Sequence, residues 1–293
     1  MNRILTIIVT YNGMQWLDKC LTMLRQSTEP TDVIVIDNCS TDGTREFVPS
    51  HYPEVIWRPQ SANLGFGQGN NLGLRYALDN GYDYVLLLNQ DAYLQTDALS
   101  HLVANCDGES LYSPIHMNGD GTLVDHNFRQ YTLLPARNTM IDDLVNGQPA
   151  SVYEVGEVCA ACWFMPIALI RKVGGFNPLF LQYGEDNNYY QRLVYHGVRT
   201  YVVPAARMWH CRKVHGSEQA FNRRLVERQM LILVSNPNPR SVGGLMAGLV
   251  RLLIRFRSHP VAYVRSLFRM LAMRSRIRQS IITDRRADTN WIN

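Results

Sequence analysis

Along the first hundred residues, short apolar runs rich in β-branched residues alternate with stretches of helical periodicity. We expect strands at Ile4–Thr10, Asp32–Asp37, Glu54–Arg58 and Tyr84–Leu88, and helices at Gly13–Gln26, Ser40–Val48 and Leu64–Leu78. Within the first of these helices, Met14, Leu17, Leu21 and Leu24 recur at the spacing of one helix face. Alternation of strands and helices predicts an α/β fold, in which a mostly parallel sheet is flanked by helices.

The pattern is less regular after residue 105. Residues 111–158 are rich in glycine and turn-forming residues, and we expect a small antiparallel extension there. Helical patterning returns at Pro166–Val173, Asp186–His196 and Ser217–Val234, with a short strand at Arg199–Val203. The sequence Asn236-Pro-Asn-Pro239 then interrupts the chain. We therefore predict one domain over residues 1–235, with parts 1–105 and 106–235, and a separate helical extension over 236–293.

Charge separates the same two regions. The net charge of the whole chain is +4, but it is −6 up to Glu227 and +10 from Arg228 onward. No acidic residue lies between Glu227 and Asp284. Regions of opposite charge usually contact different partners.

Cysteine usage and hydropathy favour an intracellular protein. The six cysteines are scattered, and Cys159 and Cys162 are the one close pair, so we expect reduced thiols. The N-terminus lacks the layout of a signal peptide, and no apolar run reaches the ~18 residues that span a bilayer. We expect a cytoplasmic protein that is peripheral on the inner face of the cell membrane.

Polar residues follow three of the predicted strands. These are Thr10-Tyr11-Asn12, Asp37-Asn38 and Asn89-Gln90-Asp91. Ligands of open parallel sheets bind outside the carboxyl ends of the strands, so these residues are candidates for a binding site. A single aspartate at such a position can equally be a helix cap or a loop residue.

Six short motifs resemble, in their order, those of the family-two inverting glycosyltransferases of GT-A fold. They are Val9-Thr-Tyr-Asn12, Ile36-Asp-Asn-Cys-Ser-Thr-Asp-Gly43, Asn63-Leu-Gly-Phe-Gly-Gln-Gly-Asn-Asn-Leu-Gly73, Leu88-Asn-Gln-Asp91, Tyr183-Gly-Glu-Asp186 and Trp209-His210. The resemblance covers about residues 4–217 and is strongest to bacterial rhamnosyltransferase-like enzymes. It implies the transfer of rhamnose or a similar hexose from a nucleotide-diphosphate donor to a glycan or lipid-linked glycan in surface polysaccharide assembly.

The resemblance also assigns the donor side of the site. It implies that Asp91 and His210 bind a divalent cation, Mg²⁺ or Mn²⁺, between the protein and the diphosphate. Asn89 stands where the family usually has a first aspartate, which leaves one carboxylate in this motif. It further implies that the nucleotide sugar is bound by eight residues: Thr10, Tyr11, Asn12, Asp37, Asn63, Gly65, Asn89 and Asp91. Gly67 and Gly69 can instead serve only chain turning and close packing, and a histidine such as His210 is often structural.

Asp186 and Glu185 are the candidate catalytic residues. The resemblance implies that Asp186 is the general base for the acceptor hydroxyl and that Glu185 orients a group or binds the acceptor. Asn188 replaces a further aspartate that the family often has. In the alternative interpretation, Glu185 and Asp186 are charges favoured by the dipole at the start of a helix.

The basic segment combines arginine with apolar residues. Arg251, Arg255, Arg265, Arg269, Arg274 and Arg278 are interleaved with leucine, valine and phenylalanine, and Pro260 separates two expected amphipathic helices. This composition favours contact with an anionic membrane surface. A homodimer interface or packing on the main domain is the alternative, and without a stacking or groove-reading motif we expect no nucleic acid partner.

Two other functions remain open from the sequence. A sugar nucleotidyltransferase needs a glycine-rich, basic loop after the first strand, and Thr10-Tyr-Asn-Gly-Met-Gln15 has no basic residue. A non-catalytic protein of the same fold that binds a glycan or a partner enzyme would tolerate the reduced metal motif.

Overall fold

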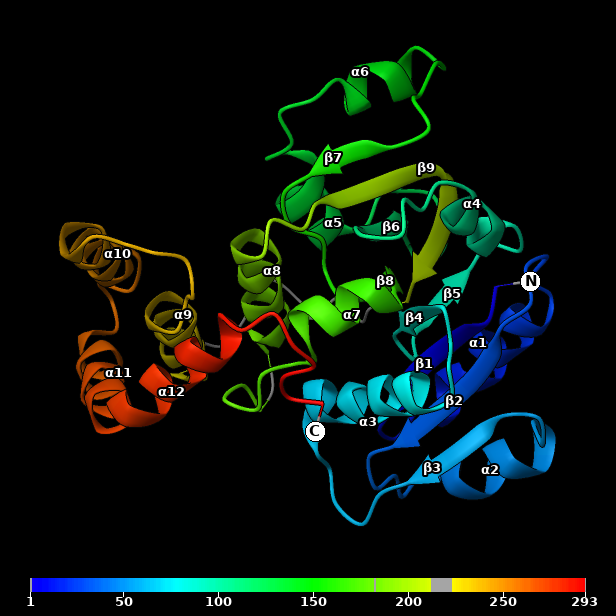
Figure 1. The fold of residues 1–293 in the computed structure, drawn as a ribbon, viewed down its shortest axis with the longest axis horizontal. Helices are drawn as coiled ribbons and strands as arrows, with labels where there is room; N and C mark the ends of the chain where they lie inside the picture. Colours follow the sequence, from blue (N-terminus) through cyan, green and yellow to red (C-terminus); the bar gives the residue numbers. More distant parts are fainter. Residues whose placement is uncertain (1, 182, 212–222, 293) are drawn as a thin grey trace.

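The computed structural model describes residues 2–181, 183–211 and 223–292, and within them the fold is α/β (Figure 1). The strands are β1 (Ile4–Thr10), β2 (Asp32–Asp37), β3 (Ile56–Pro59), β4 (Tyr84–Leu88), β5 (Ala92–Leu94), β6 (Leu111–Asn118), β7 (Tyr153–Val155), β8 (Cys162–Pro166) and β9 (Thr200–His210). The helices are α1 (Met14–Arg25), α2 (Thr44–His51), α3 (Gly65–Asp79), α4 (Ala98–Ala104), α5 (His126–Phe128), the π-helical turn η1 (Arg129–Leu133), α6 (Met140–Val145), α7 (Ile167–Val173), α8 (Glu185–Tyr195), α9 (Arg223–Val234), α10 (Val242–Arg255), α11 (Pro260–Ala272) and α12 (Arg274–Asp284).

These strands form one mixed sheet in the order β3-β2-β1-β4-β8-β6-β9-β5, with β7 paired to β9. The first four strands along the chain are parallel, and β8 joins β4 in the antiparallel direction. Alternate residues of β1 enter different cores, because successive side chains of a strand point to opposite faces. Leu5 and Ile7 pack in the core on the face of α3, α7 and α8, and Ile4 and Ile8 pack in the core on the face of α1 and α4.

The region 111–158 is not the small antiparallel extension that we expected. β6 lies inside the main sheet, where it is antiparallel to β8 and parallel to β9, and β7 is antiparallel to β9. The short strand expected at Arg199–Val203 also continues to His210. The register with β6 jumps from Val203 to Arg207, so this bulge accommodates Pro204, which cannot donate to a regular ladder.

The C-terminal helices form a third apolar cluster beside the sheet domain (Figure 1). Its buried residues include Val226 and Met230 of α9, Tyr263 and Met270 of α11, and Phe180 from the sheet domain. Three helices, rather than two, occupy the basic segment, and α11 begins at Pro260 as expected. The chain then returns to the sheet domain, where Ile292 joins the core beneath α3. Residues 217–222 of the expected helix Ser217–Val234 lie outside the described residues.

Candidate functional site

The carboxyl ends of β1, β2 and β4 meet at one edge of the sheet, and the residues predicted from the strand ends lie there. Thr10 pairs in register with Asp37, the last residue of β2. The Oγ1 atom of Thr10 donates a hydrogen bond of 2.6 Å to Oε1 of Gln90, and the same oxygen accepts 3.1 Å from the backbone N–H of Tyr11. Gln90 thus connects the ends of β1 and β4.

The loop after β1 is fixed by polar contacts to the loop after β2. The Asn12 backbone lies in the left-handed region at φ 49°, and its N–H donates to Ser40 Oγ at 2.9 Å. Its side-chain Oδ1 accepts from the N–H of Thr41 at 2.9 Å. Tyr11, in contrast, is 48% exposed.

Asp37 has protein partners in the structure. Its side chain has no exposed surface and accepts 2.8 Å from Nε of Arg45 and 3.1 Å from the N–H of Ser40. Direct contact between Asp37 and a nucleotide would require Arg45 to move. The role implied for Asp37 by the resemblance therefore stays a prediction, and in this geometry the residue organises the loop before α2.

The loop that carries Asn63 and Gly65 connects the two halves of the site. Asn38 Nδ2 donates to the carbonyl of Gly65 at 3.1 Å, and Asn63 Oδ1 accepts from the Gly65 N–H at 2.9 Å. Gly65 has φ +79°, and a Cβ atom there would lie 2.1 Å from the Leu181 carbonyl oxygen. The segment before α8 therefore rests directly on this glycine.

The close-packing interpretation of Gly67 and Gly69 is confirmed. A Cβ atom on Gly67 would lie 2.9 Å from Cβ of Phe176, and one on Gly69 would lie 2.7 Å from Cγ1 of Val9. The first turn of α3 is thus brought against β1 and against the loop before α8. The same placement sets Gly67 beside Glu185, 3.6 Å from the added Cβ.

Asp91 and His210 are brought together as predicted for a metal site. β5 pairs with the end of β9 so that Ala92 faces His210, and Oδ1 of Asp91 lies 3.3 Å from Nε2 of His210. The imidazole is buried, whereas the Asp91 side chain is 24% exposed. Asn89 stays partly exposed beside them, and its N–H donates to the Ala161 carbonyl at 3.0 Å.

One residue near this pair, Asp125, was not among the candidates from the sequence. Nδ1 of His210 lies 4.0 Å from Oδ2 of Asp125, whose Oδ1 also caps α5. A carboxylate on the second ring nitrogen orients a metal-binding histidine. Asp125 comes from the region whose pattern was unassigned, so the sequence gives no signal for it.

Glu185 and Asp186 lie in the first turn of α8. Glu185 is buried, and burial, followed by repulsion from Asp186, raises its pKa to about 7. Its Oε2 atom has no hydrogen-bond partner among the described residues. Asp186 is partly exposed, and its Oδ1 accepts from the N–H of Asn187 at 2.9 Å.

A third carboxylate, Glu157, lies near this pair and was not predicted. It accepts a short hydrogen bond from Nδ2 of Asn187, the residue after Asp186. Burial, followed by repulsion from Asp186, raises the pKa of Glu157 to about 7. Glu157 lies in a loop between β7 and β8, where the sequence has no periodicity that could have placed it.

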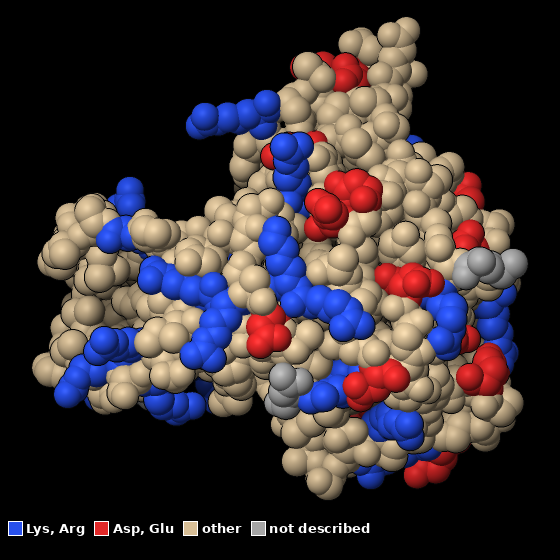
Figure 2. All heavy atoms as spheres, in the orientation of Figure 1, with Lys and Arg blue, Asp and Glu red and all other residues tan. Residues whose placement is uncertain are grey.

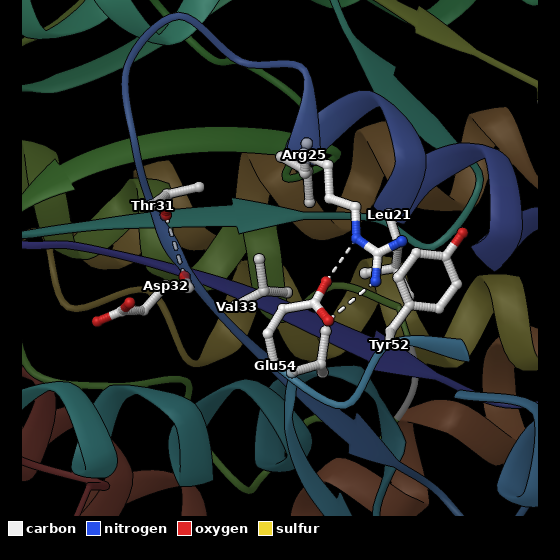
Figure 3. Close-up of a pocket in the computed structure, with 9 residues that line it drawn as sticks. Leu21, Arg25, Thr31, Asp32, Val33, Tyr52 and Glu54 are labelled. Carbon is white, nitrogen blue, oxygen red and sulfur yellow. Dashed lines mark hydrogen bonds and ion pairs between the residues drawn. The ribbon is translucent and has the colours of Figure 1, made fainter. Parts of the chain in front are cut away.

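A pocket between α1 and the segment after α2 lies away from these residues (Figure 3). It is lined by Asp32 at the start of β2 and by Arg25 and Glu54, which form an exposed ion pair. Because the candidate site is at the carboxyl end of β2, this pocket faces the opposite edge of the sheet.

Comparisons with known proteins give sequence relatives over most of the chain and several structural neighbours. N-acetylglucosaminyl-diphospho-decaprenol L-rhamnosyltransferase of Mycobacterium tuberculosis is 26% identical over 235 residues, covering 72% of this chain and 76% of that protein. Two solved structures share the fold. TarS 1–349 of S. aureus in complex with UDP-GlcNAc has a TM-score of 0.60 at 16% identity, over 97% of this chain and 89% of that one. GalNAc-T7 with UDP, GalNAc and Mn²⁺ has a TM-score of 0.64 at 13% identity, over 80% and 48%.

The family itself is shown by a sequence model. The model for glycosyl transferase family 2 matches residues 6–153, about half of the chain, from β1 to the start of β7. The GT-A type of fold expected from the motifs is confirmed by the structural neighbours. The chain is therefore a glycosyltransferase that belongs to glycosyl transferase family 2.

Proposed function

We propose that this protein transfers a hexose, with rhamnose as the first candidate, from a nucleotide-diphosphate donor to a hydroxyl group of a glycan or lipid-linked glycan in surface polysaccharide assembly. The observation that carries the proposal is the Asp91–His210 pair at the strand ends, beside Thr10 and Gln90. The name of the M. tuberculosis relative supports a rhamnosyl donor and a diphospho-lipid acceptor. The UDP-GlcNAc complex of TarS supports a nucleotide-sugar donor.

The donor side fits a divalent cation, Mg²⁺ or Mn²⁺. A carboxylate oxygen and a buried imidazole nitrogen face each other at 3.3 Å in Asp91 and His210, and Oδ2 of Asp125 lies 4.0 Å from the other ring nitrogen. Within the described ranges no group of three His, Cys, Asp or Glu residues could hold a metal, so diphosphate oxygens and waters would complete the shell. Bound there, the cation would neutralise charge on the diphosphate as it leaves.

The nucleotide would bind at the rim formed by the loops after β1 and before α3. Tyr11 offers an exposed ring, and Asn12 and Asn63 offer amide groups near the strand ends. At Gly65 the absence of a side chain would let the nucleotide approach the backbone. Asn89 would contribute from its place two residues before Asp91. Asp37 would contribute by holding the loop before α2 through Arg45 and Ser40.

The acceptor side would use Asp186 as the base of an inverting reaction. The acceptor oxygen forms a bond to C1 of the donor sugar, its proton goes to Asp186, and the bond from C1 to the diphosphate oxygen breaks with the electron pair on the diphosphate. Because its pKa is about 7, Glu185 keeps a proton over much of the neutral range and suits donation of a hydrogen bond to the acceptor. Its Oε2 atom is buried without a hydrogen-bond partner among the described residues, so this contact would require the acceptor to reach beneath the surface.

The test is nucleotide release and product analysis with a panel of donors. We expect transfer from dTDP-rhamnose or a related hexose donor to a GlcNAc-diphospho-lipid analogue, with dependence on Mg²⁺ or Mn²⁺. Glycan binding without nucleotide release would favour the non-catalytic alternative. Synthesis of a nucleotide sugar from a sugar phosphate and a nucleoside triphosphate would favour the nucleotidyltransferase.

We also propose that α10 and α11 attach the protein to an anionic membrane surface on the cytoplasmic side. α11 buries Ala262, Tyr263, Ser266 and Met270, and yet its opposite face leaves Val261, Val264, Phe268 and Leu271 between 47% and 68% exposed. On α10, Val242, Met246, Val250, Leu253 and Ile254 are exposed along one side. No helix in the described part of the chain is long and apolar enough to cross a membrane.

Charge favours lipid over a second copy of the chain as the partner of this face. Arg251, Arg255 and Arg265 are exposed around it, and the blue side chains over the lobe of α10–α12 in Figure 2 are arginines, because the sequence has no lysine after residue 213. A two-fold symmetric dimer through this face would bring arginines of both copies together. Anionic headgroups would instead pair with the guanidinium groups while the apolar side chains enter the acyl boundary.

A further inference from the structure

The carboxylate of Asp284, the last residue of α12, is buried among donors from the loop before α8, from α8 itself and from the C-terminal segment. It accepts from Nδ2 of Asn177 at 3.0 Å, from Nδ2 of Asn188 at 3.1 Å and from Nε1 of Trp291 at 2.8 Å. Nε of Arg192 lies 3.5 Å from its Oδ1 atom, and neither side chain has exposed surface. A buried charge with this many donors is held in one position.

Arg192 depends on this carboxylate. Its guanidinium donates to the backbone carbonyls of Val173 and Gly175, which are neutral acceptors. Burial lowers the pKa of Arg192, and the charge of Asp284 opposes this effect. Asp284 therefore supplies the negative charge that makes a buried guanidinium acceptable on α8.

The two residues of α8 that contact Asp284 lie on the face that also carries Glu185. Glu185, Asn188 and Arg192 are spaced three and then four residues apart, and all three are buried. The contacts of Asn188 and Arg192 with Asp284 fix the rotation of α8 about its axis. That rotation determines where Glu185 and its neighbour Asp186 point.

Residues that follow Asp284 link α3 to the loop that precedes α8. The Asn290 carbonyl accepts from the N–H of Gly175, and the Trp291 carbonyl accepts from Nδ2 of Asn71 on α3 at 2.9 Å. Asn71 in turn bonds both the N–H and the carbonyl of Phe176. The segment thus joins the helix that begins at Gly65 to the loop that precedes Glu185.

We propose that Asp284 is a positioning residue for the reaction, which holds α8 in the rotation that presents Asp186 and Glu185 to the acceptor. The contact makes turnover dependent on residues 284–292, outside the part of the chain that matches the family model. This inference rests on the proposed function of Asp186.

The experiment compares Asp284→Asn with the double variant Asn188→Asp/Asp284→Asn, which moves the carboxylate onto α8 four residues before Arg192. Asp288→Asn is the control, because Asp288 is exposed in the same segment and its side chain bonds only the next residue. We expect Asp284→Asn to lower kcat for transfer about tenfold or more, through misplacement of the base, with the donor KM little changed. The double variant should recover most of kcat, and the control should behave as the wild type.

Hydrogen–deuterium exchange over residues 185–192 gives a second readout that needs no substrate. Faster exchange in Asp284→Asn, restored in the double variant, supports the proposal even if the tested donors are wrong, and an inactive wild type would count against the proposed function instead. If Asp284→Asn does not fold, a folded double variant with wild-type kcat carries the same conclusion. Wild-type kcat and exchange in Asp284→Asn, or a double variant without recovery, would overturn it.

Discussion

Nε2 of His210 lies 3.3 Å from Oδ1 of Asp91, which joins the end of β9 to the turn after β4. This contact is the main geometric support for the proposed cation at the donor diphosphate. Asp91→Asn keeps the shape and removes the charge. We expect turnover to fall sharply and the dependence on Mg²⁺ or Mn²⁺ to weaken, as measured by initial rates over a metal titration.

The control for this change is Asp79→Asn, which alters an exposed carboxylate at the end of α3. It should leave the metal titration unchanged. Full activity of Asp91→Asn in the presence of a chelator would show that the proposed cation site is wrong.

Asp186→Asn removes the proposed base with little change of shape. Transfer should decrease by ~10² or more, while nucleotide binding measured by calorimetry persists. Glu185→Gln should be affected less, because the proposed role of Glu185 is to bind and orient. If Glu185→Gln were inactive and Asp186→Asn active, the two roles would be reversed.

The raised pKa values of Glu185 and Glu157 predict how stability changes with pH. Both rise from an ordinary value of 4.5 to about 7, so between these values the native protein holds protons that the unfolded chain has released. The free energy of unfolding should therefore fall as pH increases from 4.5 through 7, by on the order of 1–3 kcal/mol per group. Glu185→Gln should reduce this slope in urea unfolding at several pH values, whereas an unchanged slope would contradict the assignment.

The contact between Gly65 and Leu181 can be tested by comparing Gly65 with Gly147, which has a similar positive φ but no atom within 4 Å of an added Cβ. Gly65→Ala introduces a left-handed alanine at φ +79° and a contact of 2.1 Å with the Leu181 carbonyl. Gly147→Ala, at φ +70° with open space around it, carries the backbone strain alone, about 1–2 kcal/mol. We expect Gly65→Ala to lower stability further and to raise the donor KM, and equal behaviour of the two variants would exclude a role for the Leu181 contact.

Membrane attachment predicts a salt-dependent effect of the exposed face of α11. Phe268→Ser with Leu271→Ser should reduce co-sedimentation with anionic vesicles, and raised salt should weaken binding of the wild type. Leu123→Ser is the control, because Leu123 is 67% exposed, like Phe268 at 68%, but lies in the sheet domain. Equal binding to neutral and anionic vesicles would contradict the proposal, and loss of self-association without any lipid binding would identify the face as a dimer interface.

The parallel half of the sheet could be predicted from the sequence because it depends on local patterns. β1, β2 and β4 have the expected bounds, since each is a short apolar run that ends at, or is followed by, a polar residue. Thr10, Gln90 and Asp91 meet because parallel strands end at one edge. β6 and Asp125 could not be placed, because their positions depend on pairing with β9 far along the chain, and local periodicity carries no information about such pairing.

Other differences arise from tertiary contacts that override local preference. From the sequence we expected the carboxylate of Asp37 to be available to a ligand, but it forms an ion pair with Arg45, eight residues later. The segment after Asn236 looked independent by charge, and yet its only two acidic residues include Asp284, which is buried against α8. The domain boundary at residue 235 stays a prediction.

The long strand β9 has a consequence for the affinity of the site. β9 pairs with β5, β6 and β7, so the backbone that carries His210 is fixed on both sides before any ligand arrives. The rotamer entropy of this imidazole is lost during folding rather than on binding. If the proposed cation site is correct, a donor that arrives with its cation would meet one protein ligand already fixed in place, and a rigid half-site of this kind favours capture with little structural rearrangement.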